Sequence, residues 1–180
     1  MRLFIAIPLA AGVIDELSAI SRRLKSGGDG QRWTAPATWH ITLQFLGETG
    51  REQCDCVVAR LRELHLPPVP VRLEGLGCFD RSGVFFVGVK VSPELLLLEE
   101  RVKAATALCG FASETRPFQP HITLARSKDQ RRGFSELKAR IGRQPEFTRF
   151  TAGEFLLIES FLGPGGSRYE VRARFALDGG

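Results

Sequence analysis

Hydrophobic and polar positions divide the chain into short strands and amphipathic helices. Residues 2–8 are almost entirely apolar and rich in Phe and Ile, a composition that predicts a buried strand. Residues 10–25 instead place apolar side chains three or four positions apart, which predicts a helix with one buried face. The same two patterns recur as strands at 39–46, 71–79, 83–91, 121–124, 146–152, 154–162 and 168–177, and as helices at 51–65, 92–110 and 134–141.

Turn-forming and capping residues mark where these elements end. Ser92 is a natural N-cap, Pro93 occupies the first helical position, and Gly110 is expected to end the helix. The DRSG sequence at 80–83 predicts a hairpin turn between two strands. The proline-rich segment 66–70 (LPPVP) interrupts the pattern and is the best candidate for a crossover between two lobes.

The resulting order of elements, β-α-β-α-β-β-α-β-α-β-β-β, is typical of an α+β fold with much antiparallel pairing. With 180 residues, of which 43% are hydrophobic, the chain can form one domain with a sizeable core. We therefore interpret residues 1–180 as a single domain made of two intertwined lobes. No apolar run approaches the roughly 18–20 residues that span a bilayer, and Pro8 interrupts the apolar opening. We expect a cytoplasmic protein with no membrane contact.

The four cysteines indicate neither a metal centre nor a disulfide framework. Cys54 and Cys56 are too close together to bridge easily, and Cys78 and Cys109 stand alone. A Cys-Asp-Cys spacing is not a usual zinc ligand pair, and His65 is the only imidazole nearby. An even number of cysteines indicates disulfides mainly in short secreted chains. We expect structural or incidental cysteines, no bound metal and no cofactor.

The charge balance favours an anionic partner. The chain carries a formal net charge of +5, and its basic residues are 20 Arg and only 5 Lys. Because the planar guanidinium group binds phosphate with two parallel hydrogen bonds, this excess suits a nucleotide or RNA ligand. A general bias of composition towards arginine explains the excess equally well.

The tetrapeptide His-Ile-Thr-Leu occurs twice, as residues 40–43 and 121–124, and uses two of the three histidines in the chain. In a strand, alternate side chains point to opposite faces. Each copy therefore buries two aliphatic residues and presents one imidazole and one hydroxyl, His40 with Thr42 and His121 with Thr123. A single copy would be unremarkable as a core or surface histidine, but two identical copies predict a shared site.

Two strands of this kind facing each other would supply a general base and a general acid to one reacting centre. Histidine titrates near neutral pH, so one ring can be neutral while the other is protonated. Threonine hydroxyls can donate hydrogen bonds to the non-bridging oxygens of a phosphate between them. This arrangement suits phosphodiester displacement, and the sequence offers no carboxylate cluster that would hold a catalytic metal.

Arg126, five positions after His121, is a natural phosphate clamp, although by itself it could equally be a solvated surface residue. In an ideal strand it would lie on the face opposite His121, so we predict a bulge or strand end near Ala125 that turns it towards the site. The GPGGS sequence at 163–167 lacks the Lys-Ser/Thr ending of a phosphate-binding loop and is predicted to be a turn.

The paired His-x-Thr-x motifs resemble those of the 2H phosphoesterase superfamily. The flanking sequences RLFIAIPL, WHITLQFLGE, RPFQPHITLAR and FLLIESFLGPGGSRYEVRARFAL are similar to one branch in particular. That branch comprises the bacterial and archaeal RNA 2′,3′-cyclic phosphodiesterases, also called 2′-5′ RNA ligases of the LigT or ThpR type. The resemblance covers nearly the full length of the chain.

The resemblance implies a bilobal fold with pseudo-two-fold symmetry, in which two antiparallel sheets form a V-shaped cleft with helices packed outside. It implies metal-independent hydrolysis of an RNA 2′,3′-cyclic phosphate to a 2′-phosphate, and reversible ATP-independent 2′-5′ ligation of RNA. His40 would protonate the departing O3′, His121 would activate water, and Arg126 would contact the phosphate together with Thr42 and Thr123. The implied partners are tRNA halves, oligonucleotides with cyclic phosphate ends or small cyclic nucleotides, bound by a monomer.

Several alternatives stay open. The near-symmetry of the motifs does not decide which histidine is the acid. The same residues would serve a phosphodiesterase for 2′-5′ oligonucleotides or other cyclic nucleotides, and a non-catalytic module that binds RNA ends is a further reading. The aromatic side chain that stacks on a base is also undecided, with four candidates: Trp33, Phe79, Phe118 and Tyr169.

Overall fold

The computed structural model describes residues 1–26, 30–112, 116–127, 134–163 and 166–179. Its elements, in chain order, are β1 (Arg2–Pro8), α1 (Ala11–Leu24), β2 (Gln31–Trp33), the 3-10 turn η1 (Pro36–Thr38), β3 (His40–Glu48), α2 (Arg51–Arg62), β4 (Val69–Val71), β5 (Leu73–Phe79), η2 (Asp80–Ser82), β6 (Val84–Val89), α3 (Pro93–Ala107), β7 (His121–Ser127), α4 (Ser135–Ile141), β8 (Phe150–Ala152), β9 (Glu154–Gly163) and β10 (Gly166–Ala176). This order confirms the predicted one and adds the three-residue strands β2 and β4.

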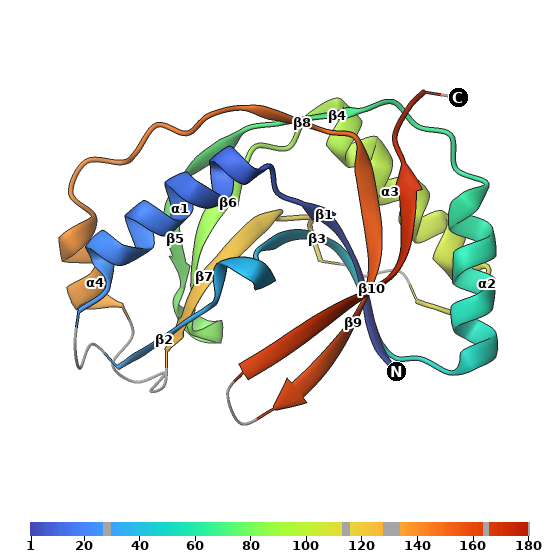
Figure 1. The fold of residues 1–180 in the computed structure, drawn as a ribbon, viewed down its shortest axis with the longest axis horizontal. Helices are drawn as coiled ribbons and strands as arrows, with labels where there is room; N and C mark the ends of the chain where they lie inside the picture. Colours follow the sequence, from blue (N-terminus) through green and yellow to red (C-terminus); the bar gives the residue numbers. More distant parts are fainter. Residues whose placement is uncertain (27–29, 113–115, 128–133, 164–165, 180) are drawn as a thin grey trace.

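The strands form two antiparallel four-stranded sheets and one short ribbon. Sheet A has the order β10-β9-β1-β3, and sheet B has the order β2-β7-β6-β5. Strands β4 and β8 pair only with each other, and this ribbon runs along the upper edge of the molecule between the two sheets (Figure 1). The predicted α+β class with two antiparallel sheets is therefore confirmed. The chain crosses from sheet A to sheet B after α2. The predicted crossover at 66–70 covers part of this path, but its last two residues, Val69 and Pro70, belong to strand β4.

Helices cover both sheets. Figure 1 shows α1 and α4 beside sheet B, and α2 and α3 beside sheet A. One large hydrophobic core joins the helices to both sheets. A buried hydrogen bond of 2.8 Å from the hydroxyl of Thr106 on α3 to the side-chain oxygen of Gln44 on β3 fixes α3 against sheet A.

One expectation about the cysteines is wrong. Cys56 on α2 forms a disulfide with Cys109, which follows α3, whereas Cys54 and Cys78 are free. The bond joins two helices that pack side by side although 53 positions separate the cysteines. Because that proximity arises from tertiary packing, cysteine spacing alone could not indicate it.

The predicted caps and turns are largely confirmed. The hydroxyl of Ser92 accepts a hydrogen bond from the N–H of Leu95 at 3.1 Å, as an N-cap does. Helix α3 ends at Ala107, and Gly110 follows with a left-handed φ of +86° that suits glycine. Between β9 and β10, residues 164–165 of the predicted turn lie outside the described residues, but the flanking residues pair as in a hairpin.

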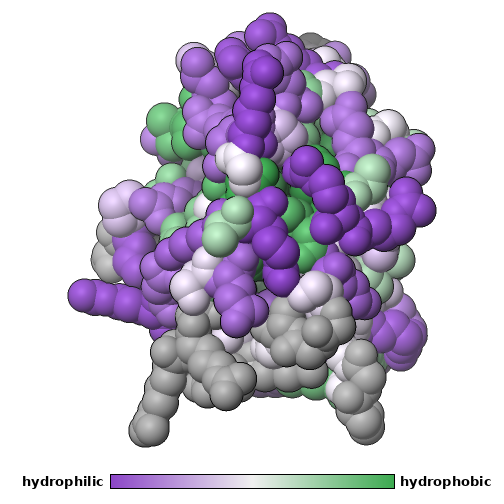
Figure 2. All heavy atoms as spheres, turned by 90° about the vertical axis from the view of Figure 1, so that its left-hand side faces the viewer, coloured by the Kyte–Doolittle hydropathy of each residue, from purple (hydrophilic) through white to green (hydrophobic). Residues whose placement is uncertain are grey.

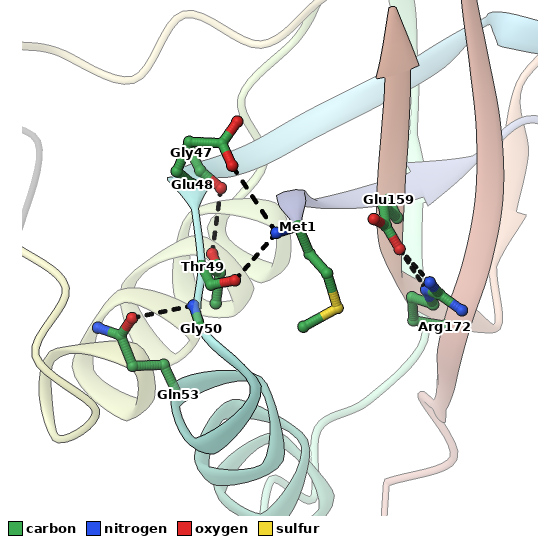
Figure 3. A network of polar contacts seen from close by, with 8 residues as sticks. All are labelled: Met1, Gly47, Glu48, Thr49, Gly50, Gln53, Glu159 and Arg172. Atoms are coloured by element: carbon green, nitrogen blue, oxygen red, sulfur yellow. Dashed lines mark hydrogen bonds and ion pairs between the residues drawn. The ribbon is translucent and has the colours of Figure 1, made fainter.

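The amino terminus is fixed to the junction between β3 and α2 (Figure 3). The ammonium group of Met1 donates to the carbonyl of Thr49 at 3.1 Å and lies 3.7 Å from the carboxylate of Glu48. The N–H of Thr49 donates back to the carbonyl of Met1 at 2.7 Å. The same view shows the buried carboxylate of Glu159 on β9 paired with Arg172 on β10. The first set of contacts fixes the start of β1 to the end of β3, and the ion pair joins β9 to β10 in the same sheet.

The face built from α1, α4 and β2 is largely hydrophilic (Figure 2). Helices α1 and α4 both end in basic residues, where positive charge is favourable beside the negative end of the helix dipole. In the described part of the chain, none of the helices is long and apolar enough to cross a membrane.

Candidate active site

The two His-Ile-Thr-Leu segments form equivalent strands in the two sheets. Strand β3 opens at His40 and pairs with β1, and β7 opens at His121 and pairs with β6. Each strand has a bulge at the same place, with Leu43 as the extra residue in β3 and Leu124 in β7. Because β3 lies against β7, the two segments come together where the sheets meet.

The bulges give both strands the same burial pattern. Over six residues the side chains are half-buried, buried, half-buried, buried, buried and exposed, in β3 as in β7. The Ile and Leu of both copies are at most 4% exposed and belong to the main core. The opposite sides of the two strands, here called the histidine face, carry His40, Thr42, His121 and Thr123. The predicted alternation of faces is thus confirmed for both copies.

Arg126 lies on the histidine face because of the bulge in β7, as predicted. Leu124 and Ala125 are consecutive and both buried, so the next residue returns to the side that carries His121. The equivalent place in β3 is occupied by Phe45, whose side chain is 73% exposed. The two halves therefore differ at this position, with a guanidinium group on one and an exposed phenyl ring on the other.

Backbone carbonyls orient both imidazole rings in the same way. Nδ1 of His40 lies 2.8 Å from the carbonyl oxygen of Thr38, and Nδ1 of His121 lies 2.8 Å from that of Gln119. Because a carbonyl only accepts, Nδ1 must carry the proton in both rings. Nε2 is then the atom of each ring that is free to exchange a proton with a ligand. In His40, Nε2 lies 3.0 Å from the hydroxyl of Thr42.

Aromatic rings flank each histidine. The ring of His40 lies 4.7 Å from that of Phe4 and 5.5 Å from that of Tyr169. The ring of His121 lies 5.1 Å from Phe79 and 5.5 Å from Phe86. In each case the two aromatic rings also pack against each other, and together they form an apolar surface beside the imidazole.

The electrostatic environment favours a neutral His40. Burial lowers the pKa of His40 to about 4, while the hydrogen bond to the carbonyl of Thr38 opposes this shift. The positive charges of His121 and Arg126 lower the pKa further. Their effect on His40 is consistent with all three side chains sharing the histidine face, a place where an anion would be strongly favoured.

Thr34 links the two halves of the site. Its hydroxyl donates to the carbonyls of Thr123 and Leu124, at 2.8 and 2.9 Å, and so binds the bulge of β7. The same hydroxyl accepts a 2.8 Å hydrogen bond from the indole N–H of Trp39, the residue before His40. One side chain therefore fixes the second motif relative to the start of the first. The sequence analysis missed this residue, because its role depends on contacts 89 and 90 positions away.

The groups on the histidine face are of the kinds that acid–base chemistry on an anion uses. It combines two imidazoles with exchangeable Nε2 atoms, hydroxyls and one guanidinium group. Within the described residues, no cluster of three or more His, Cys, Asp or Glu side chains could hold a metal ion.

Comparison with known proteins shows which family the chain belongs to. A family model described as the 2′-5′ RNA ligase superfamily matches residues 9–161. The chain belongs to the 2′-5′ RNA ligase superfamily. Among curated members, it is 31% identical to an RNA 2′,3′-cyclic phosphodiesterase of Archaeoglobus fulgidus, over 94% of this chain and 97% of that protein. It is 30% identical to one of Thermotoga maritima, over 100% of this chain and 97% of that protein.

Solved structures of similar proteins agree with this membership of the 2′-5′ RNA ligase superfamily. A crystal structure of Escherichia coli LigT complexed with 3′-AMP superposes with a TM-score of 0.84 at 28% identity and covers 98% of this chain and 97% of that one. A structure of TT0787 of Thermus thermophilus superposes with a TM-score of 0.81 at 30% identity and covers 99% of both chains. The whole described fold, and not one motif alone, is therefore shared.

The four aromatic candidates for base stacking separate into two pairs in this superfamily member. Phe79 and Tyr169 pack against the rings of His121 and His40. Trp33 and Phe118 instead pack against the main core. The exposed ring of Phe45 was missed, because its place on the histidine face depends on the bulge in β3.

Proposed function

We propose that the protein hydrolyses RNA 2′,3′-cyclic phosphate ends to 2′-phosphates without a metal ion. The observation that carries this proposal is the matched geometry of the two motifs, each with a bulged strand and an Nδ1–carbonyl bond of 2.8 Å. The curated relatives named RNA 2′,3′-cyclic phosphodiesterases support the same reaction. Cyclic phosphate ends of RNA are anionic, and the positive charges on the histidine face favour an anionic ligand.

In the proposed reaction, Nε2 of His121 accepts a proton from water as the water oxygen forms a bond to phosphorus. The bond between phosphorus and O3′ breaks, and Nε2 of His40 donates a proton to O3′. The guanidinium group of Arg126 and the hydroxyls of Thr42 and Thr123 stabilise the charge on the non-bridging oxygens. The product is a 2′-phosphomonoester with a free 3′-hydroxyl. Ligation through a 2′-5′ linkage would use the same groups, with an RNA 5′-hydroxyl in place of water as the nucleophile that attacks phosphorus while O3′ leaves, and its reverse would cleave the 2′-5′ linkage.

If His40 is the acid, the bound substrate must raise the pKa of its imidazole. The pKa of His40 is about 4, so at neutral pH the ring is neutral and Nε2 carries no proton. An acid must hold its proton until the leaving oxygen departs. The bound cyclic phosphate must therefore raise the pKa of His40, both by its own charge and by offsetting that of Arg126. If it does not, the two histidines exchange roles.

Phe45 and Arg126 would make the two sides of the site unequal. An arginine binds a phosphate with two parallel hydrogen bonds, whereas an exposed phenyl ring stacks on a base or a ribose. We propose that Arg126 contacts the phosphate and that Phe45 contacts the terminal nucleoside. The physiological RNA, including tRNA halves, and the monomeric state belong to this proposal as well.

The test is a short RNA with a 2′,3′-cyclic phosphate end, incubated with the protein in EDTA, without ATP and in ¹⁸O-labelled water. We expect an RNA with a 2′-phosphate that contains one ¹⁸O atom, identified against 2′- and 3′-phosphate standards. A 3′-phosphate product would mean that O2′ leaves, and an unchanged substrate would refute the proposed activity.

A further inference from the structure

A second cationic site lies away from the histidine face. A cavity of about 440 Å³ opens beside the β4–β8 ribbon and the start of α3. Its lining residues come from β4, from β8, from the residue next to each of these strands, and from the segment between β6 and the first residue of α3. Of the described lining residues, none belongs to β3 or β7. The ribbon forms the upper edge of the molecule in Figure 1, at the opposite end from the labelled N-terminus.

Three cationic residues line this cavity, namely Arg72, Lys90 and Arg149, and among the residues that the structure describes no acidic one lines it. Val71 pairs with Phe150 across the ribbon, and Arg72 and Arg149 are the next residues along the two chains, just beyond this last pair. The N–H of Lys90 donates to the carbonyl of Arg72 at 2.8 Å, which holds the third cation on the adjoining strand. The backbone therefore gathers the three positive charges.

Like charges that lie close together on neighbouring chains repel each other. Within the described residues, none of these three side chains has an ion-pair partner or a side-chain hydrogen bond. Other exposed cations of the protein do have such partners, as Lys138 has in Asp80 and Arg174 in Glu154. An anion between the three cations would remove their repulsion and accept several charge-assisted hydrogen bonds.

The rest of the cavity is largely apolar, with Ser92 and Thr151 as the two lining residues that carry a hydroxyl. Val71 is buried, and the ring of Phe150 is half-buried against the core. Pro70, Val91 and Pro93 complete the apolar lining. Ser92 contributes a hydroxyl that already caps α3. A cavity of this size is in the range that holds small-molecule ligands. The ligand that fits is therefore a planar or apolar body that carries a negative group.

We propose that this cavity, here called the ribbon site, binds the phosphate of a nucleotide, with its base or ribose against Phe150. The nucleotide is either free or part of an RNA strand, since both present the same chemistry. Binding here requires neither His40 nor His121. The proposal of a ribbon site is therefore independent of the proposed hydrolysis.

The test uses full-length protein with His40→Ala and His121→Ala, which removes the catalytic histidines. Binding of 5′-AMP and of a ten-nucleotide single-stranded RNA is measured by calorimetry at low and moderate salt. Arg72→Gln with Arg149→Gln is compared with Arg22→Gln with Arg101→Gln, a control that removes the same charge from exposed positions on α1 and α3. Melting temperatures of all proteins verify folding.

We expect the ribbon-site variant to bind at least one of the two probes tenfold or more weakly, while the control changes binding less than twofold. Loss of AMP binding assigns the site to a free nucleotide, and loss of RNA binding alone assigns it to a strand. Without ligand, the melting temperature of the ribbon-site variant should not fall, because repulsion is removed. Unchanged binding of both probes, or an equal loss in the control, would overturn the proposal.

Discussion

The pKa of His40 is the property of the site that should respond most to its ligand. Burial and two neighbouring positive charges lower this pKa from 6.5 to about 4 in the free protein. That difference corresponds to about 3 kcal/mol in favour of the neutral ring. An anion placed within about 4–6 Å of an imidazole raises its pKa by roughly 1–3 units. We therefore expect a pKa between about 5 and 7 when the phosphate position is filled.

The measurement is a titration of the histidine resonances by NMR, with and without sulfate, whose charge is constant over this range. The chain has only three histidines, so single variants assign every signal. By linkage, sulfate should bind roughly 10- to 1000-fold more tightly to the form with protonated His40, and its affinity should increase as the pH falls. Chloride at equal ionic strength corrects for screening.

His65 is the internal control, because it is exposed, follows α2 and lies outside the histidine face. Its resonances should not move when sulfate is added at constant pH. If sulfate and a 2′,3′-cyclic nucleotide both leave the pKa of His40 unchanged, His40 cannot be the acid at neutral pH. The roles of the two histidines would then have to be exchanged.

Three further changes test other parts of the structure. Thr34→Val removes the hydroxyl that links the two motifs, so we expect a loss of about 1–3 kcal/mol in unfolding free energy together with a lower kcat, whereas Thr34→Ser should restore both. Arg126→Gln should reduce kcat/KM on a cyclic phosphate by roughly 10²–10³-fold, with no change in melting temperature. Reduction of the disulfide, or Cys56→Ser, frees a loop of 53 residues and should lower stability by up to about 4 kcal/mol, measured by urea unfolding, whereas Cys78→Ser should not. An unchanged midpoint in Cys56→Ser would contradict the disulfide.

The features that the sequence predicts correctly are those that follow from the local periodicity of hydrophobic and polar residues. Alternation placed the histidines of both motifs on one side of their strands, and the same reasoning required the bulge that turns Arg126. Strands β2 and β4 were missed because three residues are too short for a period to be visible.

The remaining features depend on distant contacts. The Cys56–Cys109 bond follows from the packing of α2 beside α3, and the role of Thr34 follows from the pairing of β2 with β7. Phe45 reads as an ordinary buried strand residue until the bulge in β3 exposes it. Neither the pairing of β2 with β7 nor the bulge in β3 is visible in a local pattern of residues.

The central claim is that the two motifs act as one site, and single-turnover hydrolysis of an RNA 2′,3′-cyclic phosphate tests it most directly. We expect His40→Ala and His121→Ala each to slow the reaction by roughly 10²–10⁴-fold with unchanged folding. The double variant should be about as slow as the slower single one, because groups that act as a unit are not additive. A single variant that turns over at the wild-type rate would contradict the account.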